Sequence, residues 1–115
     1  MDVTTMYNSN PAYVGPILDP HIHLWRRGAV PYLADAFSAD LAQVPGVVSA
    51  IYVECRERSL TDGPAHLRTL GEARHFLAMR DHEPKLLAMV ANADLRLGAD
   101  TLEAIVKLRD LLGPA

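Results

Sequence analysis

Three short apolar runs, separated by longer mixed segments, dominate the pattern of the chain. They lie at residues 15–18, 47–53 and 86–91. The second run, Val-Val-Ser-Ala-Ile-Tyr-Val, is β-branched and almost continuously apolar. Such runs are typical of parallel strands that are covered on both faces. Each run is therefore predicted to be a buried strand.

The segments between and after these runs carry apolar side chains at helical spacing. Helices are predicted at 32–44, at 66–81 and from Asp100 to the Gly113-Pro114 stop. In the last helix, Asp100 is the expected N-cap and Glu103 completes a capping box. Its expected apolar side consists of Leu102, Ile105, Val106 and Leu112. The alternation of strand and helix predicts right-handed βαβ units, an α/β fold and a parallel sheet.

Polar side chains follow each predicted strand. They are His21 and His23 after the first strand, Glu54 after the second, and Asn92 and Asp94 after the third. In parallel α/β folds the carboxyl ends of the strands carry the chemistry. These three strand ends are expected to form one arc of a pocket.

The first strand end carries the strongest chemical signal. Asp19, His21, His23 and Trp25 occupy alternate positions, and in an extended backbone such residues point to the same side. Two neutral imidazoles suit Zn, Fe, Co or Ni. The alternative is a chance pair of loop histidines, since a closed zinc site takes four ligands and a catalytic one usually three plus water. Pro20 is expected to fray the strand pairing.

Other polar residues near these ends have two readings each. Asp19 is expected to orient a histidine or cap the loop rather than bind metal. Trp25 either walls the pocket or packs, and Asp94 either joins the pocket or caps a turn. Glu54 either faces the pocket or pairs with Arg56 or Arg58. Cys55 is expected to be an inert buried thiol, and His66, His75 and His82 are expected to be surface residues.

Composition narrows the class of protein. A chain of 115 residues, half of them hydrophobic, suits one small domain. A formal net charge of −3 without a basic run argues against nucleic acid and anionic membranes as partners. The one cysteine excludes an internal disulfide and favours a reducing compartment. Residues 1–14 are expected to be a loose lead-in without a secretory signal, and the chain is expected to be cytoplasmic.

Several segments in order carry a family resemblance. They are Leu-Asp-Pro-His-Ile-His-Leu-Trp at 18–25, Tyr-Val-Glu-Cys at 52–55, Asp-Gly-Pro at 62–64 and Val-Ala-Asn-Ala-Asp-Leu at 90–95. Together they resemble the N-terminal part of the amidohydrolase-related proteins, which are TIM-barrel, metal-dependent hydrolases that include lactonase-like members. Residues 56–60 depart from the pattern expected after the second strand.

The resemblance implies a partial domain, residues 1–115, that supplies about three βα units of a (β/α)₈ barrel. It implies that His21 and His23 are ligands of a divalent metal, with zinc expected first, and that the substrate is a lactone, amide or related carbonyl compound. Trp25, Glu54 and Asp94 are the expected pocket residues. A further histidine and the proton-accepting aspartate are expected beyond residue 115, so the chain alone is expected to be inactive.

A non-catalytic reading stays open beside the enzyme. Three βα units would leave the edges of a parallel sheet exposed. Such a remnant would self-associate as a homo-oligomer or dock onto a complementing barrel fragment.

Overall fold

Strands and helices alternate along residues 15–114, which the computed structural model of the protein describes. The strands are β1 (Ile17–Ile22), β2 (Val47–Val53) and β3 (Leu86–Val90). The helices are α2 (Ala34–Gln43), α3 (Leu70–His82) and α4 (Asp100–Leu112), with single 3₁₀ turns η1 (Ala65–Leu67) and η2 (Leu95–Leu97). The predicted α/β order is confirmed. The expected lead-in, residues 1–14, lies outside the described residues.

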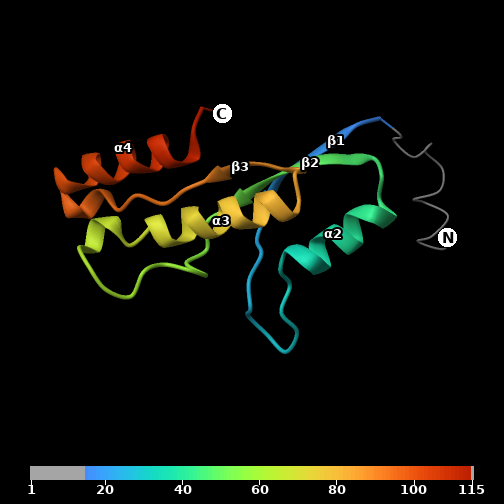
Figure 1. The fold of residues 1–115 in the computed structure, drawn as a ribbon, viewed down its shortest axis with the longest axis horizontal. Coiled ribbons are helices and arrows are strands. Elements are labelled where there is room, and N and C mark those ends of the chain that lie inside the picture. Colours follow the sequence, from blue (N-terminus) through green and yellow to red (C-terminus); the bar gives the residue numbers. More distant parts are fainter. Residues whose placement is uncertain (1–14, 115) are drawn as a thin grey trace, which may run out of the picture.

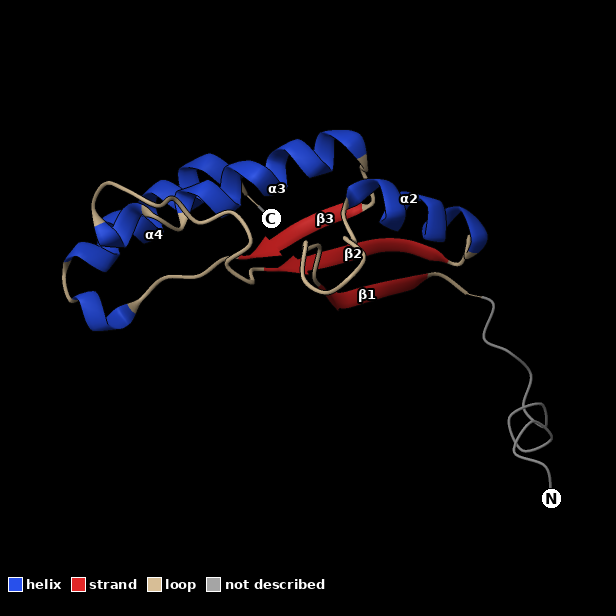
Figure 2. Ribbon diagram, turned by 90° about the horizontal axis from the view of Figure 1, so that it is seen from below, coloured by secondary structure: helices blue, strands red, loops and turns tan. Residues whose placement is uncertain are grey.

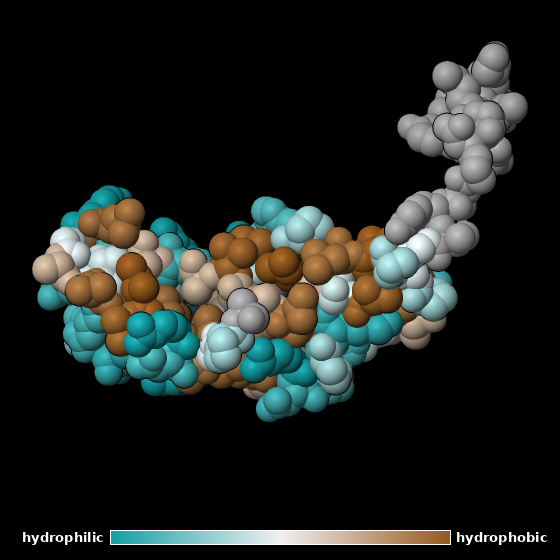
Figure 3. All heavy atoms as spheres, turned by 90° about the horizontal axis from the view of Figure 1, so that it is seen from above, coloured by the Kyte–Doolittle hydropathy of each residue, from teal (hydrophilic) through white to brown (hydrophobic). Residues whose placement is uncertain are grey.

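Within residues 15–114 the strands form one open parallel sheet in the order β1-β2-β3. Helices α2 and α3 cover one face of this sheet (Figure 1), and α4 packs against α3 beyond β3 (Figure 2). The other face carries apolar side chains that stay accessible, as the brown residues over the strands show in Figure 3. The sheet is therefore covered on one side by the described part of the chain.

The core lies between the sheet and the two helices α2 and α3. Its buried residues are Leu24, Phe37, Leu41, Ala50, Tyr52, Phe76, Met79 and Leu86. A smaller cluster of Leu70, Ala73 and Leu108 joins α3 to α4. Together these clusters bury apolar side chains of all three helices, and such packing supplies most of the stability of helices in proteins.

The first strand is longer than its apolar run predicts. It continues through Pro20 to Ile22, and its pairing with β2 shifts between Asp19 and Ile22. Asp19 lies opposite Ala50, whose side chain is buried under the helices. A bulge at this point tolerates a proline, because the residue there forms no ladder hydrogen bond.

Helix α4 differs from its prediction in two respects. Asp100 is its first residue, the N-cap is Ala99, and no side chain caps the end, so the predicted capping box is wrong. The buried side consists of Thr101, Ala104 and Leu108. The expected apolar side is largely exposed, with Leu102 at 67% and Ile105 at 44%. On the buried side, Leu108 packs against Leu70 and Ala73 of α3.

Candidate functional site

The bulge in β1 gives Asp19 its role. The backbone N–H of His21 is donated to Asp19 Oδ1 at 3.1 Å instead of to the neighbouring strand. The predicted loop-capping role of Asp19 is confirmed. The carboxylate contacts neither imidazole ring within the described residues, so the expectation that all four alternating side chains project together is wrong for Asp19.

The ring nitrogens of His21 and His23 converge. Their Nε2 atoms lie 3.1 Å apart, and the two ring planes are nearly perpendicular, at 84°. Nδ1 of His23 lies 2.8 Å from the carbonyl oxygen of Val53. Because a carbonyl only accepts, this nitrogen carries the proton and donates it. The lone pair of a neutral His23 is therefore on Nε2, directed at His21.

This arrangement fits two ligands of one divalent metal. Two imidazole nitrogens bound to tetrahedral zinc at 2.0–2.1 Å would lie about 3.3 Å apart, against the 3.1 Å found here. A backbone carbonyl that holds the other ring nitrogen is a common outer partner of metal-binding histidines. Among residues 15–114, no group of three or more His, Cys, Asp or Glu side chains gathers as a metal site. The described part of the chain thus offers two ligands.

Trp25 covers the histidine pair on one side. Its indole stacks on the His23 ring with centroids 4.9 Å apart and planes 13° apart. The guanidinium of Arg27 lies 4.9 Å from the indole centroid. Trp25 also exchanges two backbone hydrogen bonds of 2.9 Å with Tyr32, which closes the loop between β1 and α2. Trp25 therefore both lines one side of the histidine pair and stabilises the loop between β1 and α2.

Two arginines tie this loop to the one after β2. Arg26 Nε lies 2.5 Å from Glu57 Oε1, and Arg27 donates to the carbonyl of Cys55 at 2.7 Å. Burial raises the pKa of Glu57, but the hydrogen bond and charge of Arg26 outweigh it and hold that pKa below its usual value. The two strand-end loops are fixed to each other by these contacts.

Glu54 stabilises the loop that follows β2. Its Oε1 accepts the backbone N–H of Arg56 at 2.9 Å. Burial raises the pKa of Glu54, and the bond from Arg56 offsets part of that rise. The carboxylate forms no ion pair with Arg56 or Arg58 in the described part of the chain, and Glu54 is not among the residues that line the cavity described below.

A buried carboxylate, Glu72, was not anticipated from the sequence. It is 0% exposed and accepts hydrogen bonds from the hydroxyl of Tyr52 and the backbone N–H of Arg58. Burial and the bond to Glu72 raise the pKa of Tyr52. Burial also raises the pKa of Cys55, whose Sγ lies 4.0 Å from Glu72. Cys55 is half-buried rather than buried as predicted, and its raised pKa favours the protonated, unreactive form expected for it.

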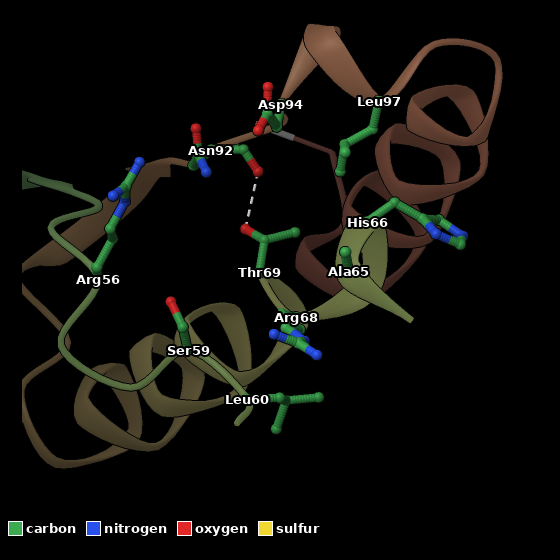
Figure 4. Close-up of a pocket in the computed structure, with 10 residues that line it drawn as sticks. All are labelled: Arg56, Ser59, Leu60, Ala65, His66, Arg68, Thr69, Asn92, Asp94 and Leu97. Carbon is green, nitrogen blue, oxygen red and sulfur yellow. Dashed lines mark hydrogen bonds between the residues drawn. The ribbon is translucent and has the colours of Figure 1, made fainter. Parts of the chain in front are cut away.

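A cavity of about 410 Å³ lies beyond the ends of β2 and β3. Its lining residues come from the loop after β2, from η1 and from the segment after β3 (Figure 4). They are Arg56, Ser59, Leu60, Ala65, His66, Arg68, Thr69, Asn92, Asp94 and Leu97. Of the three strand ends predicted to form one arc of a pocket, the segments after β2 and β3 line this cavity and, within residues 15–114, no residue of β1 or of its following loop does.

Asp94 fills both of its expected roles. It lines this cavity, and its Oδ1 accepts the backbone N–H of Arg96 at 3.0 Å at the start of η2. The guanidinium of Arg96 binds both carboxylate oxygens at 2.9 Å. These hydrogen bonds lower the pKa of Asp94 to about 2. Its negative charge is therefore already paired.

The three remaining histidines differ in exposure. His82 is a surface residue, as expected, and lies 3.0 Å from Asp35. The surface prediction is wrong for His66, whose side chain is 14% exposed and bonded to Glu103 at 2.9 Å. It is also wrong for His75, whose Nε2 is buried without a partner among the described residues and whose pKa burial lowers.

Comparison with known proteins assigns neither a family nor a function to the chain. No protein-family model, curated protein or solved structure matches the chain. In residues 15–114, none of the helices has the length and apolar character needed to cross a membrane.

Proposed function

We propose that this chain supplies the first three βα units of an amidohydrolase-like (β/α)₈ barrel that hydrolyses a lactone, amide or related carbonyl compound. The observation that carries the proposal is the convergence of His21 and His23 at the end of β1, with Nε2 atoms 3.1 Å apart. Strand ends of this kind hold the active sites of such barrels.

The sheet supports the barrel part of the proposal. Its strands are parallel and follow the chain order, and α2 and α3 lie on one face only. In a closed barrel the other face lines the interior, and helices form the outer layer. Val90, which is 54% exposed, would lie in that interior together with its pairing partner Val53.

In this scheme each residue of the histidine site has one role. His21 and His23 would hold the metal through Nε2. Val53 fixes the tautomer of His23, and Trp25 fixes its ring plane. A divalent metal held there, zinc first, would supply Lewis-acid chemistry that lowers the pKa of water and polarises the carbonyl of the substrate. The remaining ligands and the proton-accepting carboxylate come from further βα units.

Trp25 makes metal binding directly measurable, because the chain contains one tryptophan and its ring stacks on His23. Titration of the full chain with Co²⁺ should quench the fluorescence of Trp25. In the double variant His21→Gln/His23→Gln, the Co²⁺ concentration for half-quenching should rise at least about tenfold. The control His82→Gln removes an exposed histidine and should leave quenching unchanged. Equal quenching of the double variant and the wild type would show that the pair is not a metal site.

A second candidate, a non-catalytic protein that associates with copies of itself, is favoured by the uncovered sheet. Leu18 and Val90 are 44% and 54% exposed. Their pairing partners Ser49 and Val53 alternate along β2 with the buried Ala50 and Tyr52, which places the pairs on the uncovered face. A second copy could cover this apolar surface, since large exposed patches commonly mark interfaces.

A further inference from the structure

Arg56 has an unusual backbone conformation at the mouth of the 410 Å³ cavity. Its φ of 61° lies in the left-handed region, which is uncommon for residues other than glycine. The bond from its N–H to Glu54 helps to hold it there. Its guanidinium has no hydrogen-bond or ion-pair partner within residues 15–114. Strained residues of this kind gather where a side chain must be held in place for binding.

Two further polar groups face the same space. The hydroxyl of Ser59 and the side-chain amide of Asn92 line the cavity and make no hydrogen bond to other described residues. In Figure 4 the polar ends of these side chains and of Arg56 are directed into the space between the loop and the end of β3. Thr69 holds this end of β3, because its hydroxyl donates to the carbonyl of Asn92 at 2.8 Å.

The opposite side of the cavity contains aliphatic side chains beside Arg68. Leu60, Ala65 and Leu97 line it there, away from Arg56 (Figure 4). The cavity is therefore amphipathic, with Arg56 and two neutral polar groups on one side, and aliphatic groups together with Arg68 on the other.

The other charged groups of the cavity are already bonded. Asp94 is paired with Arg96, and His66 is bonded to Glu103. Both Nε and Nη2 of Arg68 donate to the carbonyl of Gly63 at 3.3 Å. A neutral carbonyl does not cancel the charge of Arg68, so the lining offers a ligand two cations. Of these two, Arg56 is the one whose guanidinium makes no hydrogen bond within residues 15–114.

The loop that carries Arg56 and Ser59 is fixed before any ligand arrives. The backbone N–H of Arg58 donates to the buried carboxylate of Glu72, and the backbone N–H of Leu60 donates to the backbone carbonyl of Arg68 at 2.9 Å. A site whose walls are already ordered loses less entropy on binding.

We propose that this cavity binds a small organic carboxylate with a short apolar chain. The guanidinium of Arg56 would hold the carboxylate in a bidentate pair, with the Ser59 hydroxyl and the Asn92 amide as further donors. The aliphatic side would receive the chain of the ligand. Inorganic phosphate also suits an arginine, but it has no apolar part to cover Leu60 and Leu97. The proposal is independent of the histidine pair, since neither His21 nor His23 lines the cavity.

The test is a titration of the ¹⁵N-labelled full chain with 3-methylbutanoate, followed by amide chemical shifts. We expect saturable shifts in residues 56–60 and at Asn92, with a Kd on the order of 1 mM for one solvent-accessible ion pair. Arg56→Gln should raise this Kd at least about tenfold. Arg56→Lys keeps the charge but lacks the planar guanidinium, so its Kd should lie between those of the wild type and Arg56→Gln. Arg74→Gln removes an exposed arginine of α3 outside the cavity and is the matched control.

Two further ligands test whether the negative charge or the shape of the ligand decides binding. The neutral 3-methylbutanamide should bind at least about tenfold more weakly than the carboxylate, and inorganic phosphate should not saturate the same amides. Ser59→Ala, which leaves the backbone of Arg56 untouched, should also weaken binding. Equal effects of Arg56→Gln and Arg74→Gln would overturn the proposal. Equal binding of acid and amide, saturation by phosphate, or shifts that lie outside the cavity would overturn it as well.

Discussion

At the scale of single residues, Glu72 joins three parts of the chain. Its carboxylate lies on α3, one partner is the Tyr52 hydroxyl at the end of β2, and the other is the backbone of Arg58 in the following loop. A fully buried carboxylate is tolerated only when donors satisfy it. Glu72 therefore anchors the loop that carries Arg56 to the core, and its role is structural.

Glu72→Ala should lower the free energy of unfolding by about 3 kcal/mol, because it leaves two buried donors unpaired at about 1–3 kcal/mol each. Urea unfolding followed by circular dichroism measures this change. Tyr52→Phe removes one donor and keeps the Arg58 bond, so its loss should be smaller, about 2 kcal/mol. An unchanged urea midpoint for Glu72→Ala would show that the carboxylate does not anchor the loop.

At the scale of elements, the contact between α3 and the loop after β2 depends on one glycine. A Cβ on Gly71 would lie 2.4 Å from the carbonyl oxygen of Arg58 and 3.0 Å from the backbone nitrogen of Leu60. Neither is the end of a flexible side chain, so the loop could not give way without leaving α3. Gly71 has a low helix propensity, but it allows the loop that carries Leu60 to pack closely against α3, and Leu60 lines the cavity.

Gly71→Ala should therefore destabilise the protein by about 1–3 kcal/mol, although the same change in a free helix stabilises it by about 1 kcal/mol. Ala78→Gly is the matched control in α3, since Ala78 is exposed and its replacement should cost about 1 kcal/mol by propensity alone. Thermal or urea unfolding of both variants measures the contrast. A more stable Gly71→Ala would mean that the loop is free to move.

At the scale of the whole molecule, the sheet is covered on one face only. Apolar residues such as Val90 lie on the uncovered face, whereas the histidine pair and the cavity lie at the carboxyl ends of the strands. Apolar side chains on α4, such as Leu102, also point outward. These surfaces are where further barrel units would pack in the proposed enzyme, and where a second copy would pack in the alternative.

Without such units, the chain should associate with itself through the uncovered sheet face. Sedimentation velocity over an about hundredfold range of protein concentration should show a rising sedimentation coefficient. Val90→Lys places a charge on that face and should abolish association, whereas Leu102→Lys, on the outer side of α4, should not. A chain that stays monomeric throughout, or that is affected only by Leu102→Lys, would contradict association through the sheet.

The sequence by itself determined the order and type of the elements and the pairing of two histidines. Continuous apolar runs favour strands, and residues two apart in a regular strand point to the same side of the sheet. For this reason β2, α3 and the convergence of His21 with His23 could be predicted from local pattern. The burial of the strands on both faces that these runs predicted is not found, because helices cover one face of the sheet only within residues 15–114. The resemblance to a barrel enzyme, its metal and its substrate stay predictions.

Tertiary structure alone decided which side chains face inward and which segments meet. The bulge at Pro20 separated Asp19 from the histidines. Packing of α4 on α3 through Leu108 left Leu102 exposed, and Glu72, for which no prediction was made from the sequence, is buried. The cavity around Arg56 brings together residues from the loop after β2, from η1 and from beyond β3. Such contacts cannot be predicted from local sequence pattern, because they depend on strand register and on the spatial distance between elements that are far apart in the chain.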